Sequence, residues 1–113
     1  MNLLLDTHAF LWFIAGDERL SKSARILIEN PENQVFLSQA SLWEMAIKIS
    51  LGKLSIGQPF EALILDQLQE NQIQLLGITL KHTAGVISLP FHHRDPFDRL
   101  LIAQAQVEQM TLI

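Results

Sequence analysis

The sequence predicts an α/β fold with a central, mostly parallel sheet of about four strands flanked by helices. Two observations predict it. Short apolar runs of strand length alternate with longer segments whose apolar residues recur at helical spacing. These segments also begin and end at residues that cap helices or form turns. With 113 residues, 49% of them hydrophobic, the chain has the size and composition of one folded domain.

Serine, glycine and proline divide the first half of the chain. A serine oxygen accepts an amide hydrogen of the first helical turn, and glycine readily closes the last turn. The expected elements are, in order, a buried parallel strand over residues 2–5, a helix over 8–15 closed by Gly16, a helix from Ser21 to Glu29, a strand over 35–37, and a helix opened by Ser38 and Ser41 that runs to about Ser50.

The second half follows the same pattern. Gly57 and Pro59 mark a turn. Pro96 suits the first position of the last helix because its missing N–H is not needed there. The expected elements are a helix over residues 60–70, a strand over 75–78, a helix from Thr79 to about Ser88 stopped by Pro90, a helix that starts at Asp95-Pro96, and a strand over 111–113.

Composition excludes several classes of function. The chain has no cysteine, which excludes disulfides, cysteine-based zinc sites and thiol catalysis. It lacks the roughly 18 consecutive apolar residues of a membrane helix, and no basic segment precedes its first apolar stretch. We therefore expect a soluble, cytoplasmic protein without a membrane partner.

The charge balance counts against a nucleic-acid partner. The net charge is −4, whereas a nucleic-acid binder usually carries a basic surface. A site built of carboxylates adds negative charge that a bound metal offsets. Lys48, Lys53, Arg94 and Arg99 are candidates for basic residues beside such a site.

Asp6 ends the first predicted strand. Ligand sites of open parallel sheets lie beyond the carboxyl ends of the strands, so this carboxylate is expected at such a crevice. The alternative is that Asp6 only caps the helix that follows it.

Glu44 lies in the middle of a strongly apolar helical segment. A carboxylate on a buried helix needs a partner or a metal ion. Two structural alternatives remain open. Ser41 and Glu44 match a capping box, and Glu44 and Lys48 have the spacing of a favourable ion pair along a helix.

Asp95 and Asp98 open the last predicted helix. Asp95 is the expected N-cap and Asp98 the third helical residue, and both positions favour acids for structural reasons alone. Several carboxylates at one crevice also suit a hard cation such as Mg²⁺ or Mn²⁺. His92 and His93 are expected in a solvated loop, and no HExxH pair, glycine-rich phosphate loop or G-x-S-x-G motif is present.

Three blocks of the sequence resemble the PIN-domain family, especially the VapC-type toxins of bacterial toxin–antitoxin pairs. They are residues 3–12 (LLLDTHAFLW), 38–48 (SQASLWEMAIK) and 93–105 (HRDPFDRLLIAQA). The blocks occur in the family's order and at similar separations, and the resemblance runs along the whole chain.

The resemblance implies a single PIN-like domain over residues 1–113, with acids gathered at one end of a parallel sheet. It implies that Asp6, Glu44 and Asp98 bind Mg²⁺ or Mn²⁺ and that the reaction is hydrolysis of RNA phosphodiester bonds. Supporting roles fall to Asp95, which assists from the side, and to Thr7 and Ser38, which hold water or orient a carboxylate.

The resemblance also implies a homodimer and a small cognate antitoxin protein that inhibits the enzyme. One departure concerns the end of the chain. Family members commonly have a further acid after the fourth strand, whereas this sequence stops at Ile113, so the domain is expected to lack the C-terminal end of the family fold. The alternative function is therefore a PIN module with little or no catalysis that binds RNA or a partner protein. A metal-dependent phosphatase is disfavoured, because His8 stands where an Asp-x-Asp motif needs its second acid.

Overall fold

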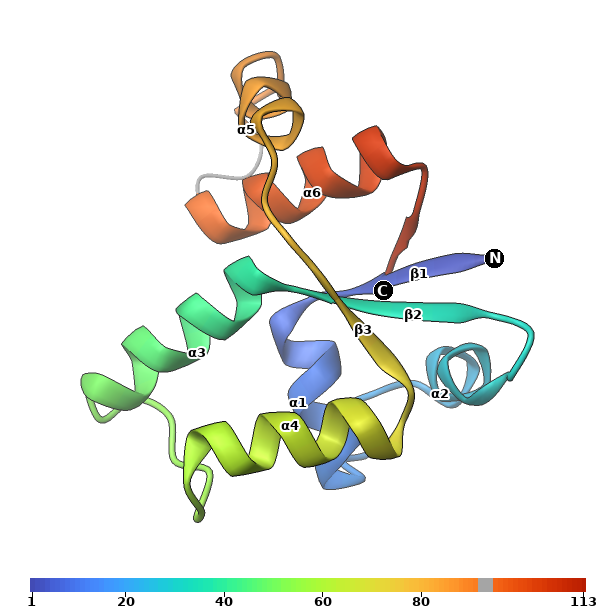
Figure 1. Cartoon of the computed structure of the whole chain (residues 1–113), viewed down its shortest axis with the longest axis vertical. Coiled ribbons are helices and arrows are strands. Elements are labelled where there is room, and N and C mark those ends of the chain that lie inside the picture. Colours follow the sequence, from blue (N-terminus) through green and yellow to red (C-terminus); the bar gives the residue numbers. More distant parts are fainter. Residues whose placement is uncertain (92–94) are drawn as a thin grey trace.

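The computed structural model describes residues 1–91 and 95–113. Their strands form one parallel sheet in the order β3-β2-β1-β4, which confirms the predicted α/β fold (Figure 1). The strands are β1 (Asn2–Leu5), β2 (Gln34–Ser38), β3 (Ile73–Leu76) and β4 (Thr111–Leu112). The helices are α1 (Thr7–Ala15), α2 (Lys22–Glu29), α3 (Gln39–Ser50), α4 (Phe60–Glu70), α5 (Leu80–Ile87) and α6 (Pro96–Glu108).

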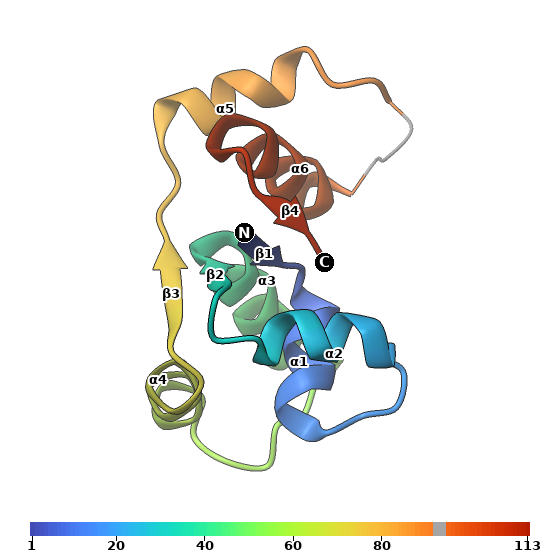
Figure 2. The same ribbon diagram turned by 90° about the vertical axis from the view of Figure 1, so that its right-hand side faces the viewer.

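Both faces of the sheet are covered, because successive strand side chains point to opposite faces. Leu3 and Leu5 of β1 belong to the larger core, with Phe10 of α1 and Ile64 of α4. Leu4 between them belongs to a smaller core on α6. Figure 2 shows the same arrangement, with α5 and α6 on one side of the sheet and α1, α2 and α4 on the other. Within the described ranges, no helix combines the length and apolar character needed to cross a membrane.

Two direct strand-to-helix junctions position the site described below. β1 runs through Asp6 into α1, and β2 runs through Ser38 into α3. The two strands are paired in parallel, with Leu5 beside Leu37, so both junctions lie at the same edge of the sheet. Residues that are more than thirty positions apart in the sequence are thereby brought together.

The third strand was predicted two residues too late. α4 ends at Glu70, and Gln72 adopts a left-handed φ of 54°, so the chain enters β3 at Ile73. Ile73 is buried opposite Val35 of β2, whereas Ile78 follows the strand and is exposed. β3 is an edge strand and pairs only with β2. The burial of Ile73 against β2 therefore determines where β3 starts, more than the apolar run of residues 75–78 does.

The predicted capping box in α3 is also wrong. Ser38 caps the helix by accepting the Ala40 N–H at 3.0 Å, and α3 therefore begins before Ser41. Ser41 is buried inside the helix and cannot act as its N-cap.

His82 belongs to the packing of α5 against α6. Its ring is fully buried, Nδ1 accepts the Thr79 N–H, and Nε2 lies 2.8 Å from a carboxylate oxygen of Glu108. Because Nδ1 accepts a hydrogen bond, Nε2 is the ring nitrogen that donates to Glu108. His82 thus joins two helices away from the edge where the acids gather.

Candidate active site

Asp6 follows β1 and is half-buried at the edge of the sheet. Its Oδ1 accepts the Ala9 N–H at 2.6 Å, so the expected capping of α1 is present. Its own backbone N–H donates to the carbonyl of Ile113, which ties the start of α1 to the end of β4. The capping bond uses one carboxylate oxygen and leaves Oδ2 outside it, so the cap does not exclude a second role.

Asp98 approaches the same place from the other end of the sequence. It lies in the first turn of α6, where a negative charge is favoured by the free amides of the helix start. Asp6 and Asp98 line one pocket of about 310 Å³, together with Leu101, Ile102 and Leu112. Two acids of the predicted set therefore face a common space.

Glu44 is buried in α3, with 4% of its surface exposed, and both carboxylate oxygens are occupied. Thr7 Oγ1 donates to Oε1 at 2.6 Å, and Lys48 Nζ donates to Oε2 at 2.8 Å. The expected Glu44–Lys48 ion pair is present. Thr7 directly follows Asp6, so this hydrogen bond connects the carboxylate on α3 to the β1–α1 junction. Such partners are what a buried carboxylate requires.

The charges around Lys48 show that the acids share one electrostatic environment. The hydrogen bond that Lys48 donates to Glu44 raises the pKa of the Lys48 ammonium group above its usual value, while partial burial opposes the shift. The negative charges of Asp95 and Asp98 raise this pKa further. Lys48 is therefore protonated at neutral pH and partly neutralises an acidic cluster.

Asp95 and Ser38, which the resemblance gave supporting roles, are both helix caps. Asp95 Oδ1 accepts the N–H groups of Phe97 and Asp98 and so holds the first turn of α6. Ser38 is fully buried and holds the first turn of α3. Each cap orients a helix that carries one of the predicted metal-binding acids.

The donor atoms at this edge fit a hard divalent cation, because carboxylate oxygens are the ligands that Mg²⁺ and Mn²⁺ prefer. Asp6 and Asp98 face one pocket, and Glu44 is linked to it through Thr7. Among residues 1–91 and 95–113, however, no three acids or histidines are already close enough to form a complete metal site. The structure thus brings the acids to one edge, with Glu44 held by Lys48.

The basic candidates have different surroundings. Lys48 lies at the site, and Lys53 lines a neighbouring pocket. Arg99 is instead 9% exposed and donates to the backbone carbonyls of Val86, Leu89 and Pro90. It therefore joins α6 to the end of α5 and to the segment that follows it. The fourth basic candidate, Arg94, lies outside the described residues, as do His92 and His93.

Comparison with known families identifies the fold that carries these acids. The family model of the PIN domain matches residues 3–113. The chain belongs to the PIN-domain family. This match confirms the resemblance inferred from the three sequence blocks, and it spans both strand-to-helix junctions and the start of α6.

Relatives of this PIN-domain protein are of the VapC type. The chain is 32% identical over 105 residues to Ribonuclease VapC22 of Mycobacterium tuberculosis, covering 92% of this chain and 78% of the relative. It is 33% identical over 60 residues to Ribonuclease VapC16 of the same organism, covering 53% of this chain and 43% of that protein.

Solved structures share the fold of this PIN-domain protein at lower sequence identity. A crystal structure of VapBC2 from Rickettsia felis bound to a promoter DNA fragment matches with a TM-score of 0.71 and 18% identity, covering 99% of this chain and 85% of that one. A toxin–antitoxin complex from Klebsiella pneumoniae matches with a TM-score of 0.61 and 14% identity, covering 97% and 82%.

Proposed function

We propose that this PIN-domain protein is a metal-dependent endoribonuclease that hydrolyses RNA phosphodiester bonds as the toxin of a toxin–antitoxin pair. The observation that carries the proposal is that Asp6 and Asp98 line one pocket while Glu44 accepts a hydrogen bond from Thr7, the residue after Asp6. Its relatives of the VapC type are named ribonucleases, which supports the same reaction class.

In this proposal Asp6, Glu44 and Asp98 hold Mg²⁺ or Mn²⁺ through their carboxylate oxygens. When bound, such an ion supplies Lewis acidity toward water and toward the phosphate. Thr7 orients Glu44 by hydrogen bonding, and Asp95 and Ser38 orient the helices that carry Asp98 and Glu44. Lys48 limits the repulsion among the acids, because its ammonium group binds Glu44 and faces the charges of Asp95 and Asp98.

The proposed partners follow from the same relationship. They are an RNA substrate, a cognate antitoxin protein and a second copy of this chain, met in the cytoplasm. Exposed apolar side chains support a protein partner. Leu80 and Ile87 of α5 are each 84% exposed, and Phe91 is 81% exposed. Large apolar side chains of this kind are common in protein interfaces.

The test is cleavage of a single-stranded RNA in the presence of Mn²⁺ or Mg²⁺. We expect cleavage with either ion and none in excess chelator, with single-stranded DNA of the same sequence as the control. Unchanged cleavage in chelator contradicts metal dependence.

The alternative is a PIN module that binds RNA or a partner protein with little turnover. The Glu44–Lys48 pair favours it, because an ammonium group on the carboxylate competes with a divalent ion for the same oxygen. It predicts RNA binding without cleavage even at high Mn²⁺ concentration, so a binding assay beside the cleavage assay separates the two functions.

Thr7→Val tests whether orientation of Glu44 matters to the site. Valine keeps the shape of threonine and removes the hydroxyl that donates to Glu44 at 2.6 Å. Loss of a hydrogen bond that orients a metal ligand typically lowers metal affinity or activity about 10- to 100-fold. We therefore expect the half-saturating Mn²⁺ concentration to rise and the cleavage rate to fall by amounts in that range.

Thr7→Ser is the matched control, because serine retains the hydroxyl and should recover most of the loss. An unchanged Mn²⁺ dependence in Thr7→Val would show that Glu44 does not need this donor. Thermal unfolding of both variants distinguishes loss of orientation from loss of folded protein.

A further inference from the structure

A second pocket adjoins the carboxylate site and has no role in the function proposed above. Its volume is about 550 Å³, within the range of about 300–1,000 Å³ that is typical of ligand sites. It lies between α1, the loop after α1, the end of α3 and the segment before α4, and we call it the α1–α3 pocket. Thr7 and Lys48, the two residues that hydrogen-bond Glu44, also line it, so it borders the surroundings of that carboxylate.

The charged side chains that line this pocket are mostly cations. Arg19, Lys48 and Lys53 line it together with one carboxylate, Asp17, although the net charge of the protein is −4. Asp17 and Arg19 pair with each other at 2.6 Å, and Lys48 pairs with Glu44 at 2.8 Å, so these charges balance one another. Within the part of the chain that the structure describes, the Lys53 ammonium group has no hydrogen bond or ion pair. The Lys53 ammonium group, the unpaired charge of this pocket among the described residues, fits an anionic ligand.

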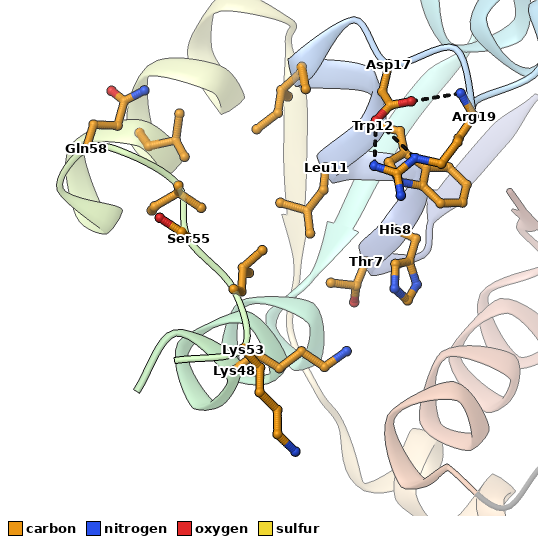
Figure 3. A pocket seen from close by; sticks show the side chains of 15 residues that line it. Thr7, His8, Leu11, Trp12, Asp17, Arg19, Lys48, Lys53, Ser55 and Gln58 are labelled. Atoms are coloured by element: carbon orange, nitrogen blue, oxygen red, sulfur yellow. Dashed lines mark hydrogen bonds and ion pairs between the residues drawn. The ribbon is translucent and has the colours of Figure 1, made fainter. Parts of the chain in front are cut away.

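The wall opposite the lysines is aromatic. Trp12 and His8, one turn apart on α1, have ring centroids 5.7 Å apart, and the Arg19 guanidinium lies 5.3 Å from the centroid of the Trp12 ring. Figure 3 shows His8, Trp12 and Arg19 on one side of the pocket and Lys48 and Lys53 on another. Proteins commonly bind single-stranded nucleic acid in this way: cationic side chains contact the phosphates, and aromatic rings stack on the bases.

We propose that the α1–α3 pocket holds one nucleotide of single-stranded RNA next to the phosphodiester at the carboxylate site. Lys53 binds its phosphate, and the His8–Trp12 pair contacts its base. This inference rests on the proposed function, because RNA is the substrate of that function. It adds a place for the strand beside the reacting bond, and it accounts for RNA binding by an acidic protein.

The test measures binding of a short single-stranded RNA to the full chain by fluorescence anisotropy, in chelator so that no cleavage occurs. We expect Lys53→Ala to weaken binding about two- to five-fold and to reduce the slope of log affinity against log salt by about 0.7, the value for one contact with a single-strand phosphate. Trp12→Leu preserves an apolar side chain and should weaken binding at least about five-fold through lost stacking.

Lys22→Ala is the matched control, because Lys22 is exposed at the start of α2 and does not line the pocket. It removes the same charge and should leave both the affinity and the salt slope unchanged. Equal effects of Lys53→Ala and Lys22→Ala overturn the proposal, because they show that only net charge matters. Equally tight binding of a duplex RNA also overturns it, since a duplex has no free base for the aromatic wall.

These outcomes are separable from those of the proposed function. If RNA binds with these dependences but is not cleaved in Mn²⁺, the pocket proposal stands and the proposed nuclease activity is contradicted. If wild type, Lys53→Ala and Trp12→Leu cleave RNA with the same KM, the nuclease proposal stands and the pocket proposal is contradicted.

Discussion

Asp6→Asn is expected to lower metal-dependent RNA cleavage by about 1,000-fold or more. Asp6 faces the same pocket as Asp98, and the amide of asparagine lacks the negative charge that holds a divalent cation. Stabilisation by a bound metal is worth several kcal/mol, and each 1.4 kcal/mol corresponds to about a tenfold change in rate. The measurement is the initial rate of RNA cleavage at saturating Mn²⁺.

Asparagine is an informative replacement because Asp6 has two roles. Its Oδ1 caps α1 by accepting the Ala9 N–H, and asparagine caps helices about as well as aspartate. The variant should therefore remain folded, with a thermal midpoint close to that of the wild type. Asp66→Asn is the matched control, because Asp66 is exposed on α4 and lines none of the pockets described above. Wild-type cleavage by Asp6→Asn would remove Asp6 from the mechanism.

Phe10→Ala is expected to reduce the free energy of unfolding by about 3–5 kcal/mol, the usual cost of removing a buried aromatic side chain. Phe10 is fully buried in the larger core, with Leu3, Leu5 and Leu37 of the two central strands. It holds α1 against the sheet, and α1 begins with the residues that form the site. The measurement is equilibrium unfolding in urea by circular dichroism.

Leu65→Ala is the comparison for this stability experiment. Leu65 is 63% exposed on α4, so its removal should change the free energy of unfolding by no more than about 0.5 kcal/mol. A loss of less than about 1 kcal/mol in Phe10→Ala would mean that the core between α1 and the sheet is poorly packed.

Much of the fold could be predicted from local signals. Gly16 and Ser21 end and begin helices as expected, because a left-handed glycine and a serine oxygen satisfy backbone groups within a few residues. Asp95 and Pro96 start α6 for the same reason. Each of these signals acts between neighbours in the chain, so it can be recognised without knowledge of the tertiary structure.

The predictions that are wrong concern features that depend on residues far apart in the sequence. Ser41 and Glu44 have the residue types and spacing of a capping box. However, β2 pairs with β1 as far as Leu37, and α3 starts directly after Ser38, so Ser41 already lies inside the helix. The position of β3 depends on the burial of Ile73 against β2, which the apolar run alone does not reveal. The sequence around Arg99 also gives no sign that its guanidinium group donates to backbone carbonyls at the end of α5 and just after it.

The sequence by itself determined the α/β class, most element boundaries, the Glu44–Lys48 pair and the acids proposed for the site. Only the tertiary structure decided that Thr7 donates to Glu44, that Asp6 and Asp98 face one pocket, and that Lys53 lies across from Trp12 in another. The physical reason is the range of each interaction. Caps and ion pairs along a helix join residues a few positions apart, whereas the site joins strand ends and helix starts that meet only after the parallel sheet has assembled.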